Sequence, residues 1–300
     1  MLTKLLTSIA ILAGISTATP TGCSSEITKE LSKVSETIEQ IDQALGELQD
    51  DTKEEDYTTD VTQDTPSQSN VRLIEMPGRM RGVPERIVHH YAYTLSFNRE
   101  SNQPNWVAWE LTKKETQGNI GRSNEFVPDP EIPFPHQVTT DDYRNSGYDR
   151  GHMAPAADMK WSGRAMKECF YMSNMCPQNG KLNSGPWGAL EKACRRWAQQ
   201  EGSVYIVCGP VFNGKRNKSI GKEHKILVPD GFFKVVLSMR KNKEKAIGFY
   251  YTNRSSKQSM DKAATSVDEI EELTGMDFFV NIPNRLEERI EAEYNLNDWR

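Results

Sequence analysis

The stretch YDRGHMAPAADM, Tyr148–Met159, brings an acid, a guanidinium and an imidazole together within four positions. These side chains are Asp149, Arg150 and His152. Gly151 lies between them, and because it has no Cβ it allows the backbone to approach other groups closely. Small and apolar residues follow, so the chain turns from a charged segment into an apolar one. Surface charge needs no such arrangement, whereas a site that handles phosphate does.

Hydrolysis of a phosphodiester bond sets three chemical tasks, and this stretch supplies residues for two of them. Water must lose a proton, which a neutral His accepts because its ordinary pKa is about 6.5. Negative charge on the phosphate must be neutralised, which Arg does through paired hydrogen bonds. The departing oxygen must be stabilised, which a bound divalent cation does as a Lewis acid. His152 and Arg150 fit the first two tasks.

A second polar stretch, SNMCPQNGKLNSGPWGALEKACRR at 173–196, supplies residues for the third task. If 182–199 form one helix, with a proline tolerated near its start, then Asn183, Glu191 and Arg195 fall within an arc of roughly 120°. The amide oxygen of Asn183 then binds a hard cation directly, and Glu191 holds one of its waters. Mg²⁺ fits this set because it keeps several waters when it is bound.

These two blocks resemble the sugar-non-specific DNA/RNA endonucleases of the ββα-metal superfamily, the family that includes endonuclease G. The family's Asp-Arg-Gly-His motif stands here at 149–152. Its block S-N-x-x-P-Q-x-x-x-x-N-x-G-x-W-x-x-L-E stands at 173–191, with every named position filled. The segments NWVAWELT (105–112) and GRSNEFVPDP (121–130) are similar to the family's early strand and its arginine-bearing segment. The resemblance covers residues 75–295, and two ordered blocks make it specific.

The resemblance implies a metal-dependent endonuclease that cuts DNA and RNA with little sequence preference and leaves 5′-phosphates. It makes His152 the general base that activates water. It makes Asn183 the only protein ligand of one hydrated Mg²⁺, for which Mn²⁺ can substitute. It makes Glu191 the residue that holds a metal-bound water.

The remaining site residues implied by the resemblance act on the substrate or on the base. Arg150 and Arg122 are expected to contact phosphate, with Arg195 assisting from the helix. Asn174 is expected to lie close to the base and to help position the base or the substrate. Every residue of the family's core motifs is present, so the resemblance implies an active site.

The expected fold class is α+β, a ββα-metal nuclease fold with a central antiparallel sheet flanked by helices. Alternating apolar and polar residues predict strands at 89–98 and 105–112 that form a hairpin. Apolar runs predict further strands, which are 168–175, 203–212, 232–240 and 245–253. Helical spacing predicts helices at 181–200 and 266–275, the second starting with the capping box of Ser266 and Glu269 and stopping at Gly275.

The start of the chain has the features of an export signal. Residues 1–23 contain Lys4, then an apolar run too short for a confident membrane span, then small residues. The sequence TGC at 21–23 is similar to a bacterial lipoprotein box with Cys23 as the lipidated residue, whereas STA at 16–18 suits plain cleavage. The expectation is an exported protein, either anchored in the bacterial cell envelope through Cys23 or periplasmic or secreted.

Residues 24–49 and 50–70 are expected to separate this signal from the nuclease domain at 71–300. An unbroken heptad pattern predicts an amphipathic helix that self-associates as a coiled coil or lies on another surface. Its apolar positions are Ile27, Leu31, Val34, Ile38, Ile41, Leu45 and Leu48. The following segment is acidic, rich in Thr, Ser and Gln and nearly free of aliphatic residues, which predicts a flexible linker.

Charge is distributed unevenly along the 300 residues. Residues 1–70 hold 4 Lys and 13 Asp or Glu, a net charge of −9, whereas the remaining 230 residues carry a net charge of +4. The main domain is therefore mildly basic, which permits a polyanionic partner. The apolar fraction of 36% is enough for a core but excludes a membrane protein made of spanning segments.

The cysteines and the biological activity each leave alternatives open. If Cys23 carries lipid, four cysteines remain (Cys169, Cys176, Cys194 and Cys208), which permit two disulfides of undetermined pairing or four buried thiols. The alternative to the nuclease is an inert nucleic-acid-binding or structural lipoprotein with a coiled-coil stalk. A metal-dependent phosphodiesterase for small molecules is a second alternative.

Overall fold

A computed structural model of the protein describes residues 73–300, except 215–216 and 255–257. The predicted signal peptide (1–23), heptad helix (24–49) and linker (50–70) all lie outside the described residues. Gln68–Arg300 form one compact unit. Within the described part of the chain, no helix has the length and apolar character needed to cross a membrane.

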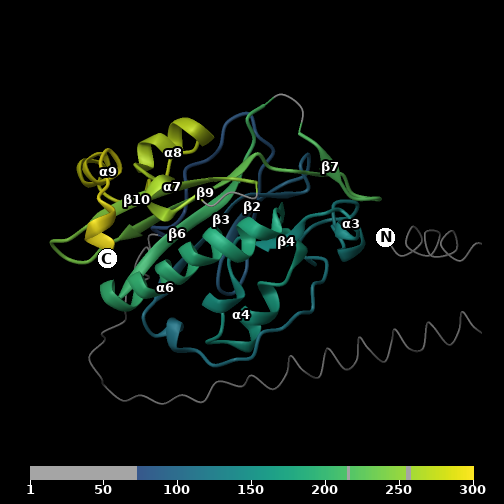
Figure 1. The fold of residues 1–300 in the computed structure, drawn as a ribbon, viewed down its shortest axis with the longest axis horizontal. Helices are drawn as coiled ribbons and strands as arrows, with labels where there is room; N and C mark the ends of the chain where they lie inside the picture. Colours follow the sequence, from purple (N-terminus) through teal and green to yellow (C-terminus); the bar gives the residue numbers. More distant parts are fainter. Residues whose placement is uncertain (1–72, 215–216, 255–257) are drawn as a thin grey trace, which may run out of the picture. The chain divides into compact units, whose positions relative to one another are not determined.

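A seven-stranded sheet forms the centre of this unit (Figure 1). Its strands, in spatial order, are β1 (Arg86–His89), β2 (Thr94–Asn98), β3 (Gln103–Thr112), β6 (Ser203–Val211), β9 (Gly231–Ser238), β10 (Lys245–Thr252) and β11 (Ala264–Thr265). Every neighbouring pair is antiparallel. Two smaller pairs lie outside it: β4 (Asp149–His152) with β5 (Met175–Gln178), and β7 (Ser219–Ile220) with β8 (Ile226–Leu227).

The helices lie along the sheet and at its edges (Figure 1). They are α3 (Thr140–Tyr143), α4 (Gly163–Glu168), α5 (Gly180–Leu182), α6 (Gly188–Glu201), α7 (Met260–Ala263), α8 (Val267–Thr274) and α9 (Asn284–Glu291). Short 3₁₀ turns occur at Glu115–Gln117, Ala156–Asp158, Met172–Asn174 and Leu296–Trp299. This architecture confirms the predicted α+β class with a central antiparallel sheet.

Both faces of the sheet are buried, and successive residues of a strand point to opposite faces. On β9, Phe232 and Val236 join the core cluster that includes Leu190 and Trp197 of α6. The intervening Phe233 joins the other cluster, with residues of α8 and α9. The sheet therefore separates the layer of α6, β4 and β5 from the layer of α8 and α9.

The predicted hairpin is confirmed from residue 94 on, since β2 pairs with β3, but the predicted strand at 89–98 begins too early, because 90–93 form a turn between β1 and β2. The three later predicted strands are confirmed within two residues as β6, β9 and β10. The predicted strand at 168–175 is wrong. Glu168 ends α4, and a 3₁₀ turn follows at Met172–Asn174, so only the last residue of the predicted run belongs to a strand. This run is apolar because the segment lies inside the core, with the side chains of Phe170 and Met172 almost completely buried.

The predicted helix at 181–200 is broken near its start. Residues Asn183–Trp187 form a π turn in which Gly185 has non-helical angles (φ −101°, ψ −109°), and Pro186 follows it. The regular helix α6 begins at Gly188. The predicted common arc is therefore wrong for Asn183, which lies before the break, whereas Glu191 and Arg195 are one turn apart on α6.

The predicted second helix is confirmed as α8. The side-chain oxygen of Ser266 accepts a hydrogen bond from the backbone N–H of Glu269, which is half of the predicted capping box. Gly275 ends the helix in the left-handed region at φ 69°, a conformation that glycine adopts without a steric penalty.

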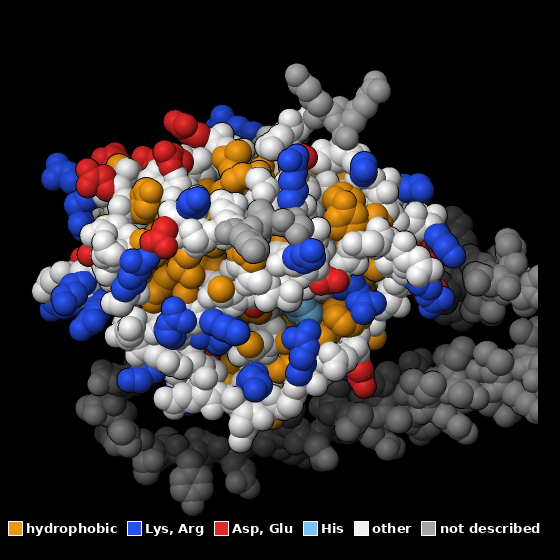
Figure 2. Space-filling model, in the orientation of Figure 1, with side chains coloured by type: hydrophobic (Ala, Val, Ile, Leu, Met, Phe, Trp, Pro, Cys, Tyr) orange, Lys and Arg blue, Asp and Glu red, His pale blue; other side chains and the backbone are white. Residues whose placement is uncertain are grey.

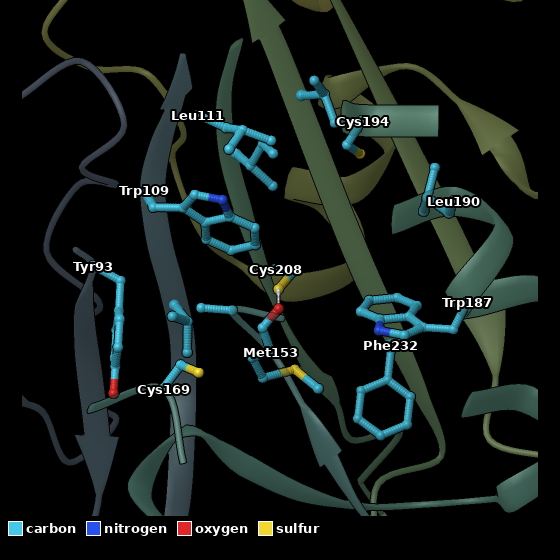
Figure 3. Close-up of a cluster of buried hydrophobic side chains, with 14 of the residues drawn as sticks. Tyr93, Trp109, Leu111, Met153, Cys169, Trp187, Leu190, Cys194, Cys208 and Phe232 are labelled. Carbon is cyan, nitrogen blue, oxygen red and sulfur yellow. Dashed lines mark hydrogen bonds between the residues drawn. The ribbon is translucent and has the colours of Figure 1, made fainter. Parts of the chain in front are cut away.

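The four cysteines of the described residues are free and buried. Figure 3 shows Cys169, Cys194 and Cys208 among the apolar side chains of the core, with Cys208 bonded to Met153. The Cys208 thiol donates to the backbone oxygen of Met153 at 3.3 Å. Of the two alternatives left open by the sequence, buried thiols are the one the fold contains.

Candidate active site

The pair of short strands β4 and β5 carries the Asp-Arg-Gly-His motif. Gly151 pairs with Cys176, and His152 pairs with Met175. A Cβ added to Gly151 would lie 2.4 Å from Oε1 of the Gln178 side chain, which is fully buried. The motif therefore requires glycine at this position, because any side chain would collide with the neighbouring strand.

His152 lies at the end of β4 in a mostly aromatic setting. The side chain is 7% exposed, and its Nε2 atom has no hydrogen-bond partner among the described residues. The imidazole meets the ring of Phe170 edge-on at 4.8 Å between centroids, and the ring of Phe126 at 5.5 Å. Burial, then the positive charges of Arg122 and Arg150, lowers the pKa of His152 to about 3. The imidazole is therefore neutral at physiological pH.

The same two phenyl rings hold two guanidinium groups. The Cζ atom of Arg150 lies 4.2 Å from the centroid of Phe126, and that of Arg122 lies 5.1 Å from the centroid of Phe170. Cation–π contacts of this kind limit where the long side chains can go. The fold thus brings together His152 and both arginines that the sequence assigned to phosphate.

Phe126 and Phe170 were not predicted as site residues. The available signals were weak: Phe126 lies four positions after Arg122, and Phe170 lies in a run that resembles a core strand. A parallel bridge between Val127 and Tyr171 joins the two segments. This bridge explains how residues 44 positions apart come to flank one imidazole.

Asn183 is linked to the motif through Asp149. Its Nδ2 atom donates a hydrogen bond to Oδ2 of Asp149 at 2.9 Å. The amide is half-buried, and this bond occupies its nitrogen end. The amide oxygen is consequently the end that is left for a ligand. A neutral amide oxygen beside an exposed carboxylate is a donor set that suits a hard, hydrated divalent cation.

Glu191, on the first turn of α6, is half-buried. Burial, the largest cause, raises the pKa of its carboxyl group to about 7, while Lys234 acts in the opposite direction. Smaller effects come from Asp158, which raises the pKa, and from Arg195 and Arg122, which lower it. Arg122 thus acts on both Glu191 and His152, which shows that these groups share one electrostatic environment.

Lys234 is an additional charged residue that sequence reasoning missed. It is 1% exposed on β9, with Nζ 4.6 Å from the centroid of Trp187 and 5.0 Å from that of Trp109. Burial alone lowers its pKa, but nearby thiols and the carboxyl groups of Glu191 and Asp158 raise it above the ordinary value. The signal in the sequence was a single Lys inside the apolar run FFKVVL.

Arg195 and Asn174 both have polar groups that are hydrogen-bonded within the protein. The Arg195 guanidinium donates to Oδ1 of buried Asp158 at 2.7 Å, so its first partner is a carboxylate and not phosphate. Asn174 is fully buried, and its amide bonds the backbone N–H and oxygen of Ala154 and the oxygen of Cys169. Asn174 therefore fixes the backbone two residues after His152, and the residue that follows it, Met175, pairs with His152.

Comparisons with known proteins agree with this geometry. A sequence model of the DNA/RNA non-specific endonuclease family matches residues 79–285. "Nuclease 1, mitochondrial" of Schizosaccharomyces pombe is 35% identical over 67% of this chain and 68% of its own length. The human "Nuclease EXOG, mitochondrial" is 32% identical over 63% of this chain, and the match spans 56% of that protein. A Nostoc "Nuclease" is 36% identical over 67% of this chain and 76% of its own.

A solved structure shares the fold. The crystal structure of an EndoG/EndoGI complex matches with a TM-score of 0.66 and 29% sequence identity, over 75% of this chain and 96% of that chain. This match confirms the predicted ββα-metal nuclease fold.

The predicted location in a bacterial envelope, periplasm or medium is contradicted by these comparisons. The similar nucleases of S. pombe, Xenopus laevis, human and Saccharomyces cerevisiae are all named as mitochondrial. A short apolar run after one lysine does not distinguish a bacterial export signal from other amino-terminal segments. Cys23, the predicted site of the lipid anchor, lies outside the described residues.

Proposed function

Because the chain belongs to the DNA/RNA non-specific endonuclease family, we propose that it hydrolyses phosphodiester bonds of DNA and RNA and leaves 5′-phosphates. The observation that carries the proposal is a neutral, buried His152 whose Nε2 lacks a partner, beside two guanidinium groups held on aromatic rings. A base, an anion-binding pair and a cation-compatible amide then stand in one site.

In this proposal His152 takes the proton from the attacking water. A neutral imidazole is required for that step, and burial together with Arg122 and Arg150 keeps it neutral. Phe126 and Phe170 pack against the imidazole, and Nε2 has no hydrogen-bond partner among the described residues. The imidazole is therefore held in its neutral form across a wide pH range.

Arg150 and Arg122 bind the phosphate that is cut. Their contacts with Phe126 and Phe170 place the guanidinium groups before substrate arrives, so less conformational entropy is lost on binding. Contacts from a guanidinium group to phosphate oxygens carry no sequence information. This supports cleavage of both DNA and RNA with little sequence preference.

The residues around Asn183 fit a hydrated Mg²⁺, for which Mn²⁺ can substitute. Asn183 would offer its amide oxygen, because its nitrogen end is bonded to Asp149, and Glu191 would accept from a water of the ion. When bound, the ion supplies charge stabilisation for the leaving oxygen. Lys234 and Arg195 favour the ionised form of Glu191, which that role requires.

Digestion of plasmid DNA and of ribosomal RNA by the full chain, with Mg²⁺ or with EDTA, tests the proposal. His152→Ala should lower the rate roughly 10²- to 10⁴-fold, the usual contribution of a general base, with nucleic-acid binding retained. His89→Ala is the matched control, since His89 is exposed on β1 and bonds only Thr94 in the described structure. Asn183→Ala should abolish the Mg²⁺-dependent activity.

Two results would count against the proposal. An intact plasmid bound by the wild-type protein in Mg²⁺ would favour the inert binding protein. Equal hydrolysis of a small phosphodiester and of polymers, at every salt concentration, would favour the small-molecule enzyme, because polyanion binding weakens with salt.

We also propose that the heptad positions at 27–48 make the chain self-associate. The support is the unbroken apolar repeat in the sequence. Sedimentation of the full chain should give an oligomer, and the double variant Leu31→Glu, Ile38→Glu should give a monomer. A monomeric wild-type chain would remove this proposal and leave the nuclease proposal untouched.

A further inference from the structure

Three carboxyl groups converge on the helices that lie across the sheet from His152. Asp268 and Glu271 belong to α8, and Glu291 is the last residue of α9. One carboxylate oxygen from each lies within 4.8 Å of the other two. Figure 2 shows acidic side chains gathered at the corner where Figure 1 places these helices, while Lys and Arg predominate over the lower part of that face.

Glu291 differs from an ordinary surface acid. Its side chain is 4% exposed, and Oε1 is buried without a hydrogen-bond partner among the described residues. Burial removes the hydrogen bonds that water would donate to a carboxylate oxygen, which costs free energy when no other donor replaces them. Its position against two further carboxyl groups indicates that the missing partner carries positive charge.

The surrounding protein does not supply that charge. None of the three acids forms a salt bridge with Lys or Arg in the described part of the chain, and Arg289 of α9 pairs with Glu244 instead. The cluster is therefore electrostatically unbalanced in the protein alone.

We propose that Asp268, Glu271 and Glu291 bind one Ca²⁺ ion between α8 and α9. Ca²⁺–oxygen distances of about 2.3–2.6 Å let ligands on opposite sides of the ion lie roughly 5 Å apart, which accommodates all three oxygens. Mg²⁺, at about 2.0–2.1 Å, spans only about 4.2 Å and demands octahedral geometry. Water completes the flexible Ca²⁺ shell.

The role of this ion is structural. The main-chain contact from Phe278 N–H to Oε1 of Glu271 and the packing of Ile270 and Ile290 in one core cluster already join α8, α9 and the loop between them. The ion adds a bond between the two helices and removes the repulsion between their carboxylates. Because the sheet separates this cluster from His152, the site stands independently of the proposed nuclease function.

Thermal unfolding of the full chain, freed of metal with EDTA and then given Ca²⁺, tests the proposal. When Ca²⁺ exceeds its Kd about 100-fold, the Tm of the wild type should rise by roughly 5 °C or more. Glu291→Gln should be at least as stable as the wild type in EDTA and should show no rise with Ca²⁺. Glu272→Gln, an exposed acid on α8, is the matched control and should keep the full rise.

Two further variants keep the result decisive. If Glu291→Gln does not fold, Asp268→Asn should lose the Ca²⁺ response in its place. Asn183→Ala should keep the response, because its site is on the other face of the sheet. A Tm unaffected by Ca²⁺, an equal rise in Glu291→Gln, or a rise lost only in Asn183→Ala would overturn the proposal.

Discussion

At the scale of single residues, the site depends on what surrounds each titratable group. His152 is buried next to two positive charges, which favours its neutral form, whereas Glu191 is half-buried with both signs of charge nearby. The pKa of the histidine therefore falls to about 3 and that of the glutamate rises to about 7. A loss of enzyme activity as the pH falls through neutrality is usually assigned to protonation of a histidine. Here the group whose pKa lies near neutrality is Glu191.

This assignment predicts the pH dependence of kcat/KM. Activity should fall as the pH drops through about 7, because Glu191 gains a proton there, while His152 stays neutral. Glu191→Gln should have a lower rate but a flat profile down to well below the ordinary histidine pKa of about 6.5. Cleavage rates at low substrate concentration, measured across pH, check this. A limb near 6.5 that survives in Glu191→Gln would contradict it.

Lys234 is expected to act as a positioning residue through Glu191. Lys234→Met keeps a long side chain of similar shape in the apolar cluster but removes the charge that lowers the pKa of Glu191. The acid limb of kcat/KM should therefore move to higher pH, with the rate recovering in alkaline buffer. Lys192→Met, at an exposed position of α6, should leave the profile unchanged. A lower rate with an unmoved limb would indicate a purely structural role.

The motifs in the sequence contained the chemistry of the site but not its surroundings. His152, Arg150, Arg122, Asn183 and Glu191 could be chosen because their side chains match the tasks of phosphodiester hydrolysis. Phe126, Phe170 and Lys234 could not be chosen from the sequence. A phenyl ring or a lysine in an apolar run can be assigned to the site only from its contacts in the folded protein. For the same reason the buried role of Asn174 was hidden.

At the scale of elements, β4 and β5 hold the site where the Gln178 side chain of β5 packs tightly against Gly151 of β4. The narrowest point is Gly151 against Gln178, where the two strands leave no room for a Cβ. Because the pair of strands β4 and β5 is short, its register depends on the contact between Gly151 and Gln178. Loss of it would displace His152, which is the next residue.

Gly151→Ala should therefore destabilise the protein by about 1–3 kcal/mol, the usual cost of overpacking, and should also lower activity. Gly163→Ala is the matched control, because nothing lies within 4 Å of a Cβ at the start of α4. It should leave the free energy of unfolding unchanged or slightly raised. Urea unfolding of both variants provides the measurement. Equal stabilities would show that Gln178 moves aside freely.

Elements with regular patterns were predictable, and interrupted ones were not. The strands β6, β9 and β10 follow continuous apolar runs, and α8 has its cap at Ser266 and its stop at Gly275. The run at 168–175 is equally apolar, but it is a turn that crosses the core. The helix around Pro186 breaks at Gly185 since the flexibility of glycine and the missing donor of proline coincide there.

At the scale of the whole molecule, the sheet is buried on both faces, and the four thiols of the described residues lie within the core. Burial raises the pKa of Cys169 and Cys194 to about 12 and that of Cys208 to about 11. Thiols held in the protonated form and away from solvent react slowly.

The native protein should consequently expose at most one reactive thiol, that of Cys23, to a thiol reagent such as Ellman's reagent. All five cysteines should react once the chain is unfolded in guanidinium chloride. The free energy of unfolding should not change when a reducing agent is added, because no disulfide joins the described cysteines. Rapid labelling of two or more thiols in the native state would contradict this arrangement.

The resting of two guanidinium groups on phenyl rings has a consequence for where a long duplex is cut. If these arginines bind phosphate as proposed, they contact the sugar-phosphate backbone and do not read the edges of the bases in the grooves. What remains for the protein to sense is how wide the minor groove is and how readily each step of the duplex bends. A map of cleavage positions should then rise and fall with local flexibility, with rigid A-tracts cut less often than pliable TA and CA steps, even though no base is read directly.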